Sequence, residues 1–413
     1  MAGVPLQTTI QSASAVEDLV RARRRLQAWI EANDFAGYEP YDILNSPYLS
    51  GRLPRRWPIN ILLIQMGKRF AGLKIRRSLS VPPSKNPKAL GLLLSAYCAL
   101  NRCDEDTRRV AEVLKSELIR LRSPDTAFFC WGYDWDFYSL RGPVMSAFSP
   151  NAIATYFCAR GLLDMAEVFA DTEALDMAES AARFFLHRLN RSVDSQDHLC
   201  FSYTPGNFSV IYNSSALVGA FLARMARISK NRRYTDLARR AMRFLVSSQR
   251  SDGSWFYGEK SRQHWIDHFH TGYNLCALHE YGESSGDRSF EPALMQGYTF
   301  YKEHFFESTG APKYFHNLLY PIDIHSCAQG ILTSLTFASR DNSAFDHAIN
   351  MARWVVANMQ ADDGSFYFQR HRFWTNRTPY MRWGQAWMFS ALSRLELDIG
   401  LDRAFRQPGR RTC

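Results

Sequence analysis

The sequence lacks the cysteine patterns that hold metals or stabilise small secreted domains. No CxxC pair occurs, and the eight cysteines of the 413 residues are scattered along the chain. Most stand in apolar surroundings, such as Tyr97-Cys98-Ala99 and Leu275-Cys276-Ala277. Such cysteines are typical of small core residues in a reducing compartment. We therefore expect no disulfide and no zinc cage, in a cytoplasmic protein. No cofactor is predicted either.

Several other signals are missing. No apolar run is long enough to cross a membrane, and the N-terminus has no basic region followed by an apolar one, so neither a span nor a secretory signal is predicted. Apolar and polar residues never alternate over a stretch long enough for a sheet. No zinc-finger, helix-turn-helix or RNA-binding pattern accompanies the net charge of +10, which argues against a nucleic-acid partner.

Apolar and aromatic side chains, in contrast, are abundant. Apolar residues make up 46 % of the sequence and aromatic residues 14 %. The first figure allows a large core, and the second suits a cleft in which ring-shaped ligands stack.

A helical repeat runs through most of the chain. Each unit pairs a helix of small and apolar residues with an amphipathic helix that has Arg or Lys on one side. The apolar helices are expected to start near Lys88, Asn151, Asn213, His270, His325 and Gly384. The amphipathic helices are expected at 16–32, 105–122, 172–189, 232–249, 288–306 and 343–359.

Six helices of each kind predict an all-α fold, a closed (α/α)6 toroid formed by residues 1–413 as a single domain. A two-helix unit cannot bury its own apolar face, so neighbouring units must stack. Helices that are apolar nearly all round belong inside the ring, and amphipathic helices belong outside. An open solenoid is the alternative, but it needs polar capping repeats, which are not evident.

Two segments stand outside this repeat. Residues 34–86 form a basic, proline-rich insertion between the first outer and the first inner helix, and residues 400–413 form a basic tail. Within the insertion, Ile59–Met66 is apolar over about two helical turns. This pattern is typical of a buried helix with a solvated basic rim. The alternative is a patch that rests on an anionic membrane face or binds an acidic glycan.

The long loops of such a toroid gather at one mouth of the ring. They are 34–87, 123–150, 190–212, 250–269, 307–324 and 360–383. Long aromatic and polar loops around one mouth mark a ligand site.

Two similar segments open consecutive inner helices at that mouth. One contains Asp267 and His270, the other Asp323 and His325, and Asp42 comes from the first long loop. A carboxylate and an imidazole at a helix start can exchange protons, so these five residues are the predicted catalytic groups. The alternative for each Asp is a plain N-cap. No HExxH spacing occurs, and we predict no metal.

Aromatic, cationic and amide side chains of the same loops are the predicted substrate-binding residues, because sugar rings stack on aromatic faces while Arg and Asn bind hydroxyls or carboxylates. They are Lys88, Trp131, Tyr133, Asn151, Tyr203, Asn213, Trp255, Tyr320, Arg370, Trp374, Tyr380, Arg382, Trp383 and Gln385. Packing within the loops is the alternative for each one. Lys88, Arg370 and Arg382 are expected to favour an anionic ligand such as a uronic acid; pairing of Arg382 with a nearby acid is the alternative.

Several segments carry a family resemblance over roughly residues 38–397. The turn QRSDGSW and the segments YEPYDILNS, WIDHFHTGYN, YPIDIH and PYMRWGQAW resemble proteins encoded with bacterial capsule and exopolysaccharide machinery, within the six-hairpin glycosidase-like superfamily. Ser248-Gln249 to Trp255 is also similar to a repeat of terpenoid cyclases, although their acidic donor motif is absent.

The first resemblance implies an enzyme of surface-polysaccharide synthesis or modification. Its chemistry would be acid/base catalysis on a glycan or sugar intermediate, by hydrolysis, lyase elimination or epimerisation. Other polysaccharide-assembly proteins at the membrane face are potential partners, in which case the protein would be peripheral to the inner membrane. The alternatives are a non-catalytic glycan-binding or scaffold protein and a terpenoid-cyclase-like barrel.

Overall fold

Helices form nearly the whole molecule in the computed structural model, which describes residues 6–49, 57–100, 105–136 and 145–406. In these residues the inner ring consists of α4 (Pro87–Leu100), α6 (Ala152–Phe169), α8 (Tyr212–Ser229), α10 (His268–Ser285), α12 (Ile324–Phe337) and α14 (Ala386–Arg406). The outer ring consists of α1 (Leu6–Ala32), α5 (Glu105–Arg120), α7 (Thr172–Arg188), α9 (Arg232–Ser247), α11 (Glu291–His304) and α13 (Ala344–Met359).

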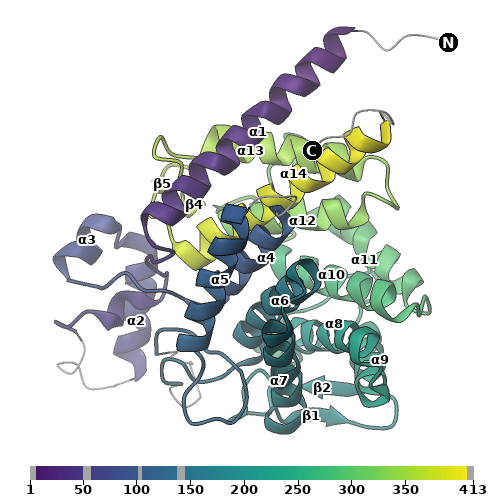
Figure 1. Ribbon diagram of the computed structural model, residues 1–413. Helices are drawn as coiled ribbons and strands as arrows, with labels where there is room; N and C mark the ends of the chain where they lie inside the picture. Colours follow the sequence, from purple (N-terminus) through teal and green to yellow (C-terminus); the bar gives the residue numbers. More distant parts are fainter. Residues whose placement is uncertain (1–5, 50–56, 101–104, 137–144, 407–413) are drawn as a thin grey trace.

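Contact between the last and first inner helices closes the ring (Figure 1). Helix α14 packs against both α12 and α4, and against α1, the outer helix at the other end of the chain. The predicted (α/α)6 toroid is therefore confirmed. Five inner helices begin within two residues of the predicted starts, and Gly384 lies in a π-helical turn, η3 (Met381–Gln385), that leads into α14.

Two outer helices differ from prediction. Helix α1 begins at Leu6 instead of residue 16, because its first turns are too polar to show an amphipathic period. Helix α11 begins at Glu291 instead of residue 288, since Pro292 is favoured in a first helical turn and sets the start.

The inner helices approach one another closely where they carry glycine. A Cβ atom added to Gly91 of α4 would lie 2.5 Å from the Phe157 carbonyl oxygen, and one added to Gly161 of α6 would lie 2.5 Å from the Gly91 oxygen. These two backbones are therefore in contact, which any larger side chain would prevent.

The recurring Gln-x-x-Asp-Gly-Ser turn joins neighbouring outer helices. Gln249 Nε2 donates to the Gly253 carbonyl at 3.0 Å and to the Ala293 carbonyl of α11 at 2.9 Å. Gln360 Nε2 makes the same two bonds, to Gly364 at 3.0 Å and to Ala22 of α1 at 2.9 Å. The motif is thus explained by ring assembly.

Short strands occur in the mouth loops, although no sheet was predicted. Strands β1 (Arg191–Asp194) and β2 (Leu199–Phe201) form an antiparallel hairpin. Strands β3 (Ile322–Asp323), β4 (Gln369–Arg370) and β5 (Thr375–Asn376) form a small antiparallel sheet. Elements of two to four residues are too short to give a visible period in the sequence.

The insertion projects from the ring at its edge (Figure 1). It contains η1 (Asp42–Asn45), α2 (Trp57–Phe70) and α3 (Leu73–Ser78), with a small core of their own formed by Ile43, Ile64, Ala71 and Val81. The basic block at 52–56 and the tail residues 407–413 lie outside the described residues. None of the described helices is long and apolar enough to cross a membrane.

Candidate active site

A small cavity lies beneath the mouth loops at the N-terminal ends of the inner helices. Its volume is about 170 Å³, which suits a single sugar ring. The lining is aromatic, cationic and imidazole-bearing: Tyr41, Lys88, Tyr133, Trp135, Ile153, Tyr203, Asn213, Tyr257, Phe269, His270, Tyr273, His325, Arg382 and Trp383. Among the described residues, no Asp or Glu side chain lines this cavity.

A larger hollow of about 800 Å³ opens toward the C-terminal halves of the inner helices, away from the mouth. Several of its charged side chains pair with one another: Arg224 contacts Asp164 at 2.6 Å, and Arg227 contacts Glu167 at 2.7 Å. Groups already neutralised in this way offer little to a reacting substrate. We therefore take the smaller cavity, despite its size, as the candidate site.

Asp267 caps α10 and holds the imidazole of His270. Its carboxylate accepts from the His270 backbone N–H at 3.0 Å, from Trp265 Nε1 at 2.9 Å, and lies 2.7 Å from His270 Nδ1. A carboxylate at this distance makes Nδ1 the donor, which leaves Nε2 as the nitrogen that can accept a proton. Asp267 is thus both a cap and the partner of a candidate base.

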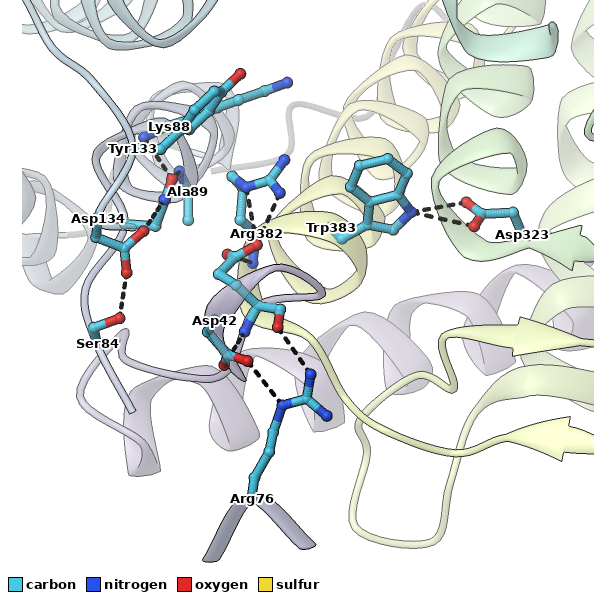
Figure 2. Close-up of polar contacts among 12 residues, drawn as sticks. Asp42, Arg76, Ser84, Lys88, Ala89, Tyr133, Asp134, Asp323, Arg382 and Trp383 are labelled. Atoms are coloured by element: carbon cyan, nitrogen blue, oxygen red, sulfur yellow. Dashed lines mark hydrogen bonds and ion pairs between the residues drawn. The ribbon is translucent and has the colours of Figure 1, made fainter. Parts of the chain in front are cut away.

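Asp323 caps α12 but does not bind the imidazole ring of His325. It accepts from the His325 backbone N–H at 2.9 Å and from Gln369 Nε2 at 2.7 Å. It also accepts from Trp383 Nε1 at 3.0 Å, as Figure 2 shows. Burial raises the pKa of Asp323 against the effect of these bonds. It lies behind Trp383, outside the cavity lining, and its geometry is that of a buried structural acceptor.

The imidazole of His325 bonds instead to a tyrosine. Nε2 lies 2.7 Å from the Tyr273 hydroxyl oxygen, and the ring stacks on Phe269 with centroids 4.4 Å apart. Burial, followed by the positive charges of Lys88 and Arg382, lowers the pKa of His325 well below its usual range. His325 is therefore a neutral imidazole, whereas His270 is backed by a carboxylate.

Lys88 is a buried amine on the cavity wall. Its Nζ lies 4.4 Å from the centroid of the Phe157 ring and 5.3 Å from that of Trp387, and it has no hydrogen-bond partner among the described residues. Burial, then the charge of Arg382, lowers the pKa of Lys88 well below its usual range. An amine in this state can donate to a substrate oxygen or accept a proton from one.

Arg382 enters the cavity already paired. Its Nε and Nη2 donate to Glu39 Oε2 at 3.0 and 2.8 Å, and its guanidinium stacks near the rings of Trp135 and Trp383. Burial raises the pKa of Glu39 to about 8, opposed by Arg382. The expected alternative of pairing with an acid is thus observed, while Nη1 has no partner among the described residues and remains available to a ligand.

Further carboxylates form a layer behind the cavity wall (Figure 2). Asp42 accepts from Arg76 Nε at 2.9 Å, a buried pair in which burial raises the pKa of Asp42 to about 6. Asp134 accepts from Ser84 and Asn86. Asp42 therefore stabilises the insertion and does not face the cavity.

The predicted binding residues divide into two groups. Lys88, Tyr133, Tyr203, Asn213, Arg382 and Trp383 line the cavity. The others do not, and most have evident structural partners. Trp131 and Trp255 donate to the carbonyls of Leu118 and Leu245, Asn151 caps α6, Gln385 bonds to the Phe366 backbone, and Tyr380 packs under Arg76.

The remaining three lie in the outer loops. Arg370 donates to Asn358 at 2.7 Å, Trp374 stacks on His371, and Tyr320 is 40 % exposed. None of them lines the cavity.

Several residues of the site were not singled out from the sequence, and Tyr273 and Glu39 matter most among them. Tyr273 lies three residues after His270, a spacing that places both on one helix face and could have indicated it. Glu39 had no such signal, because its partner Arg382 is 343 residues away in the chain.

His268 and His270 are separated by one residue but point to different partners. His268 is fully buried near the Tyr301 hydroxyl and Phe305, on the side away from Asp267. In the described part of the chain, no group of three or more His, Cys, Asp or Glu is arranged to hold a metal ion.

No protein-family profile and no curated protein sequence match this chain. Solved structures do share its fold. Cellobiose 2-epimerase from Bacillus thermoamylovorans B4167 superposes with a TM-score of 0.60 at 11% identity, over 78% of this chain and 90% of the epimerase. The GH76 α-mannanase from Bacteroides thetaiotaomicron superposes with a TM-score of 0.57 at 12% identity, over 76% of this chain and 87% of the mannanase. An unsaturated glucuronyl hydrolase specific for heparin superposes with a TM-score of 0.58 at 13% identity, over 78% of this chain and 89% of the hydrolase. The protein therefore has the (α/α)6 toroid fold of these carbohydrate-acting enzymes.

Proposed function

We propose that this protein is a carbohydrate-processing enzyme that moves a proton at the carbon next to a sugar carbonyl, as an epimerase or isomerase does. The observation that carries the proposal is the pair of imidazoles, His270 and His325, on neighbouring inner helices around one aromatic cavity. Two groups that can take and return a proton on different faces of one carbon are what inversion of that carbon requires.

His270 has the geometry of the base. Asp267 holds its Nδ1–H and would stabilise the imidazolium formed when Nε2 takes the proton from carbon. His325 is neutral at rest and bonded to Tyr273. After taking a proton from solvent through the tyrosine hydroxyl, it would return that proton to the other face of the carbon as an imidazolium and become neutral again, while His270 releases the proton it took to solvent. The roles exchange when the reaction runs backward.

Lys88 and Arg382 would stabilise the oxygen on which negative charge develops. Both lie on the cavity wall, and in a site that excludes water such donors are worth more than in solution. The free Nη1 of Arg382 would also bind the carboxylate of a uronic acid, so an acidic sugar remains part of the proposal.

Glycoside hydrolysis is the second candidate, since two of the similar structures are hydrolases. It commonly needs two carboxyl groups facing the sugar. Three carboxylates that bond to lining residues, Asp267, Glu39 and Asp323, do not line the cavity themselves and are occupied by His270, Arg382 and Trp383. A terpenoid-cyclase reaction fits less well, because a cavity with lysine, arginine and two histidines is not the apolar floor that it predicts.

The place of this reaction in capsule or exopolysaccharide synthesis rests on the segments WIDHFHTGYN and PYMRWGQAW. Both segments contribute cavity residues, so the resemblance and the site coincide. The substrate would then be a sugar unit or glycan intermediate of that synthesis.

Incubation in D2O with reducing mono- and disaccharides, neutral and uronic, tests the proposal by proton NMR. We expect loss of the C2 proton signal of one sugar, together with the appearance of its C2 epimer or its ketose. Release of a free sugar without deuterium incorporation would contradict it and favour hydrolysis. Binding of a sugar with neither outcome would favour the non-catalytic alternative.

A further inference from the structure

Helix α2 of the insertion carries a stripe of apolar side chains that are exposed and so do not pack into the core of the ring. Ile59, Leu62, Met66 and Phe70 recur along α2 at helical spacing and are all exposed, Leu62 by 59% and Phe70 by 63%. The opposite side of α2 is buried through Ile64. The sequence predicted a buried helix or a surface patch, and the helix has one face of each kind.

A second exposed apolar segment lies near the C-terminal end of α2. The turn between β4 and β5 presents Phe373, which is 86% exposed, and Trp374. Asn376 Nδ2 donates to the Lys68 carbonyl of α2 at 3.2 Å, so the turn adjoins the C-terminal end of that helix. Large apolar side chains gathered on a surface commonly mark a binding face.

The charges around both segments have one sign. The sequence contains no Asp or Glu from Ile43 to Cys103, and none from Gly364 to Leu395. The exposed cations of these segments include Arg69, Lys74 and Arg77 on α2 and α3, and Arg372 and Arg377 around the turn. An apolar face whose own segments carry cations and no acids complements a surface that is apolar inside and anionic outside.

We propose that this face, formed by α2, α3 and the β4–β5 turn, docks on an anionic lipid bilayer. Leucine, methionine, phenylalanine and tryptophan side chains would enter the interface between headgroups and acyl chains, and the cations would contact lipid phosphates. A protein partner would need an acidic surface of comparable area around an apolar centre. An anionic bilayer has both properties over its whole surface.

The helix that carries the face also contacts the cavity wall. On the inner side of α2, Lys68 Nζ lies 5.4 Å from the centroid of Trp383 and 5.5 Å from that of Tyr41, both of which line the cavity. Docking would therefore hold this wall of the cavity beside the bilayer. The proposal does not depend on the reaction, because binding is measured without a substrate.

Sedimentation of the full chain with lipid vesicles tests the proposal. We expect binding to phosphatidylcholine vesicles that contain phosphatidylglycerol, weaker binding to phosphatidylcholine alone, and a decline with salt. A triple variant, Leu62→Ser with Phe70→Ser and Phe373→Ser, should lower the affinity at least about tenfold. Arg69→Gln with Lys74→Gln should lower it about fivefold for each charge removed.

Matched controls are available on the far side of the ring. Phe208 is 70% exposed in the loop before α8, and Arg232 is exposed at the start of α9. Phe208→Ser and Arg232→Gln should leave vesicle binding unchanged. Absence of wild-type binding to anionic vesicles would overturn the proposal, as would equal losses in the controls. Concentration-dependent dimers abolished by the triple variant, without vesicle binding, would assign the face to a second copy instead.

Discussion

The two Asp/His segments at the mouth have nearly the same sequence and different surroundings. In both, the Asp caps an inner helix and accepts the backbone N–H of the histidine. Asp267 also holds the ring of its histidine, whereas Asp323 bonds to Trp383 and Gln369 and leaves its histidine to Tyr273. One segment therefore forms a carboxylate–imidazole pair, and the other a structural carboxylate beside a neutral imidazole.

The difference shows that an Asp at an N-cap can hold an imidazole at the same time. From the sequence alone, an N-cap interpretation competes with a catalytic one for each Asp. In the first segment a single carboxylate caps the helix and holds the ring, with one oxygen on the backbone and the other on Nδ1. In the second segment, Gln369 and Trp383 of the last long loop donate to the Asp323 carboxylate, which therefore does not bind the His325 ring.

The largest loss of turnover is expected when the pair of Asp267 and His270 is changed. Asp267→Asn keeps a cap but removes the charge that stabilises a protonated His270. We expect turnover of the sugar found by NMR to fall by at least about 1,000-fold, with little change in affinity. Steady-state kinetics and calorimetric binding measure the two quantities separately. Equal turnover in the variant and the wild type would contradict the role of the pair.

His268 lies between Asp267 and His270 in the sequence but has only structural contacts, so it can be compared with His270 as a histidine without a catalytic role. Burial lowers its pKa to about 3 in the folded state. Between pH 6.5 and 3 the unfolded chain therefore binds a proton that the folded chain does not, so stability falls as pH falls. From pH 7 to 4 this group should contribute a loss of about 3 kcal/mol.

Urea unfolding at the two pH values measures this loss. His268→Phe should lose about 3 kcal/mol less than the wild type over the same range, whatever its stability at pH 7. An identical pH dependence in the variant would show that His268 is protonated in the folded protein.

Asp323→Asn tests the second segment as a structural element. The amide oxygen can still cap α12 and accept from Trp383, but it cannot satisfy both Trp383 and Gln369 as a carboxylate does. We expect the free energy of unfolding to fall by roughly 1–3 kcal/mol. Turnover at a temperature where the variant is folded should fall much less than in Asp267→Asn. The reverse order of the two activity losses would exchange the roles of the segments.

Tyr273→Phe should cause the smallest loss of turnover among these variants of the cavity. It removes the hydroxyl bonded to His325 Nε2 while keeping the ring that packs against Phe157 and Trp387. We expect roughly a tenfold loss of turnover, or about 1.4 kcal/mol, and an unchanged unfolding midpoint. A loss as large as that of Asp267→Asn would make the tyrosine itself the proton donor.

Much of the architecture could be predicted from the sequence, and less of the site. Helix periodicity and apolar helices fixed the ring, because these signals are local. The site depends on contacts between distant segments, such as Arg382 with Glu39 and Trp383 with Asp323. Trp131 and Trp255 were expected at the ligand because loop aromatics look alike in sequence, yet each is fully buried with its indole N–H bonded to a backbone carbonyl.

The central claim is that His270 and His325 act on opposite faces of one carbon. It is tested most directly by deuterium exchange at C2 of the two epimers, followed separately by NMR in His270→Asn and His325→Asn. Two-sided proton transfer predicts that each variant loses epimerisation but still exchanges the C2 proton of one epimer, a different one in each variant. Exchange of both epimers at the wild-type rate in either variant would contradict the claim.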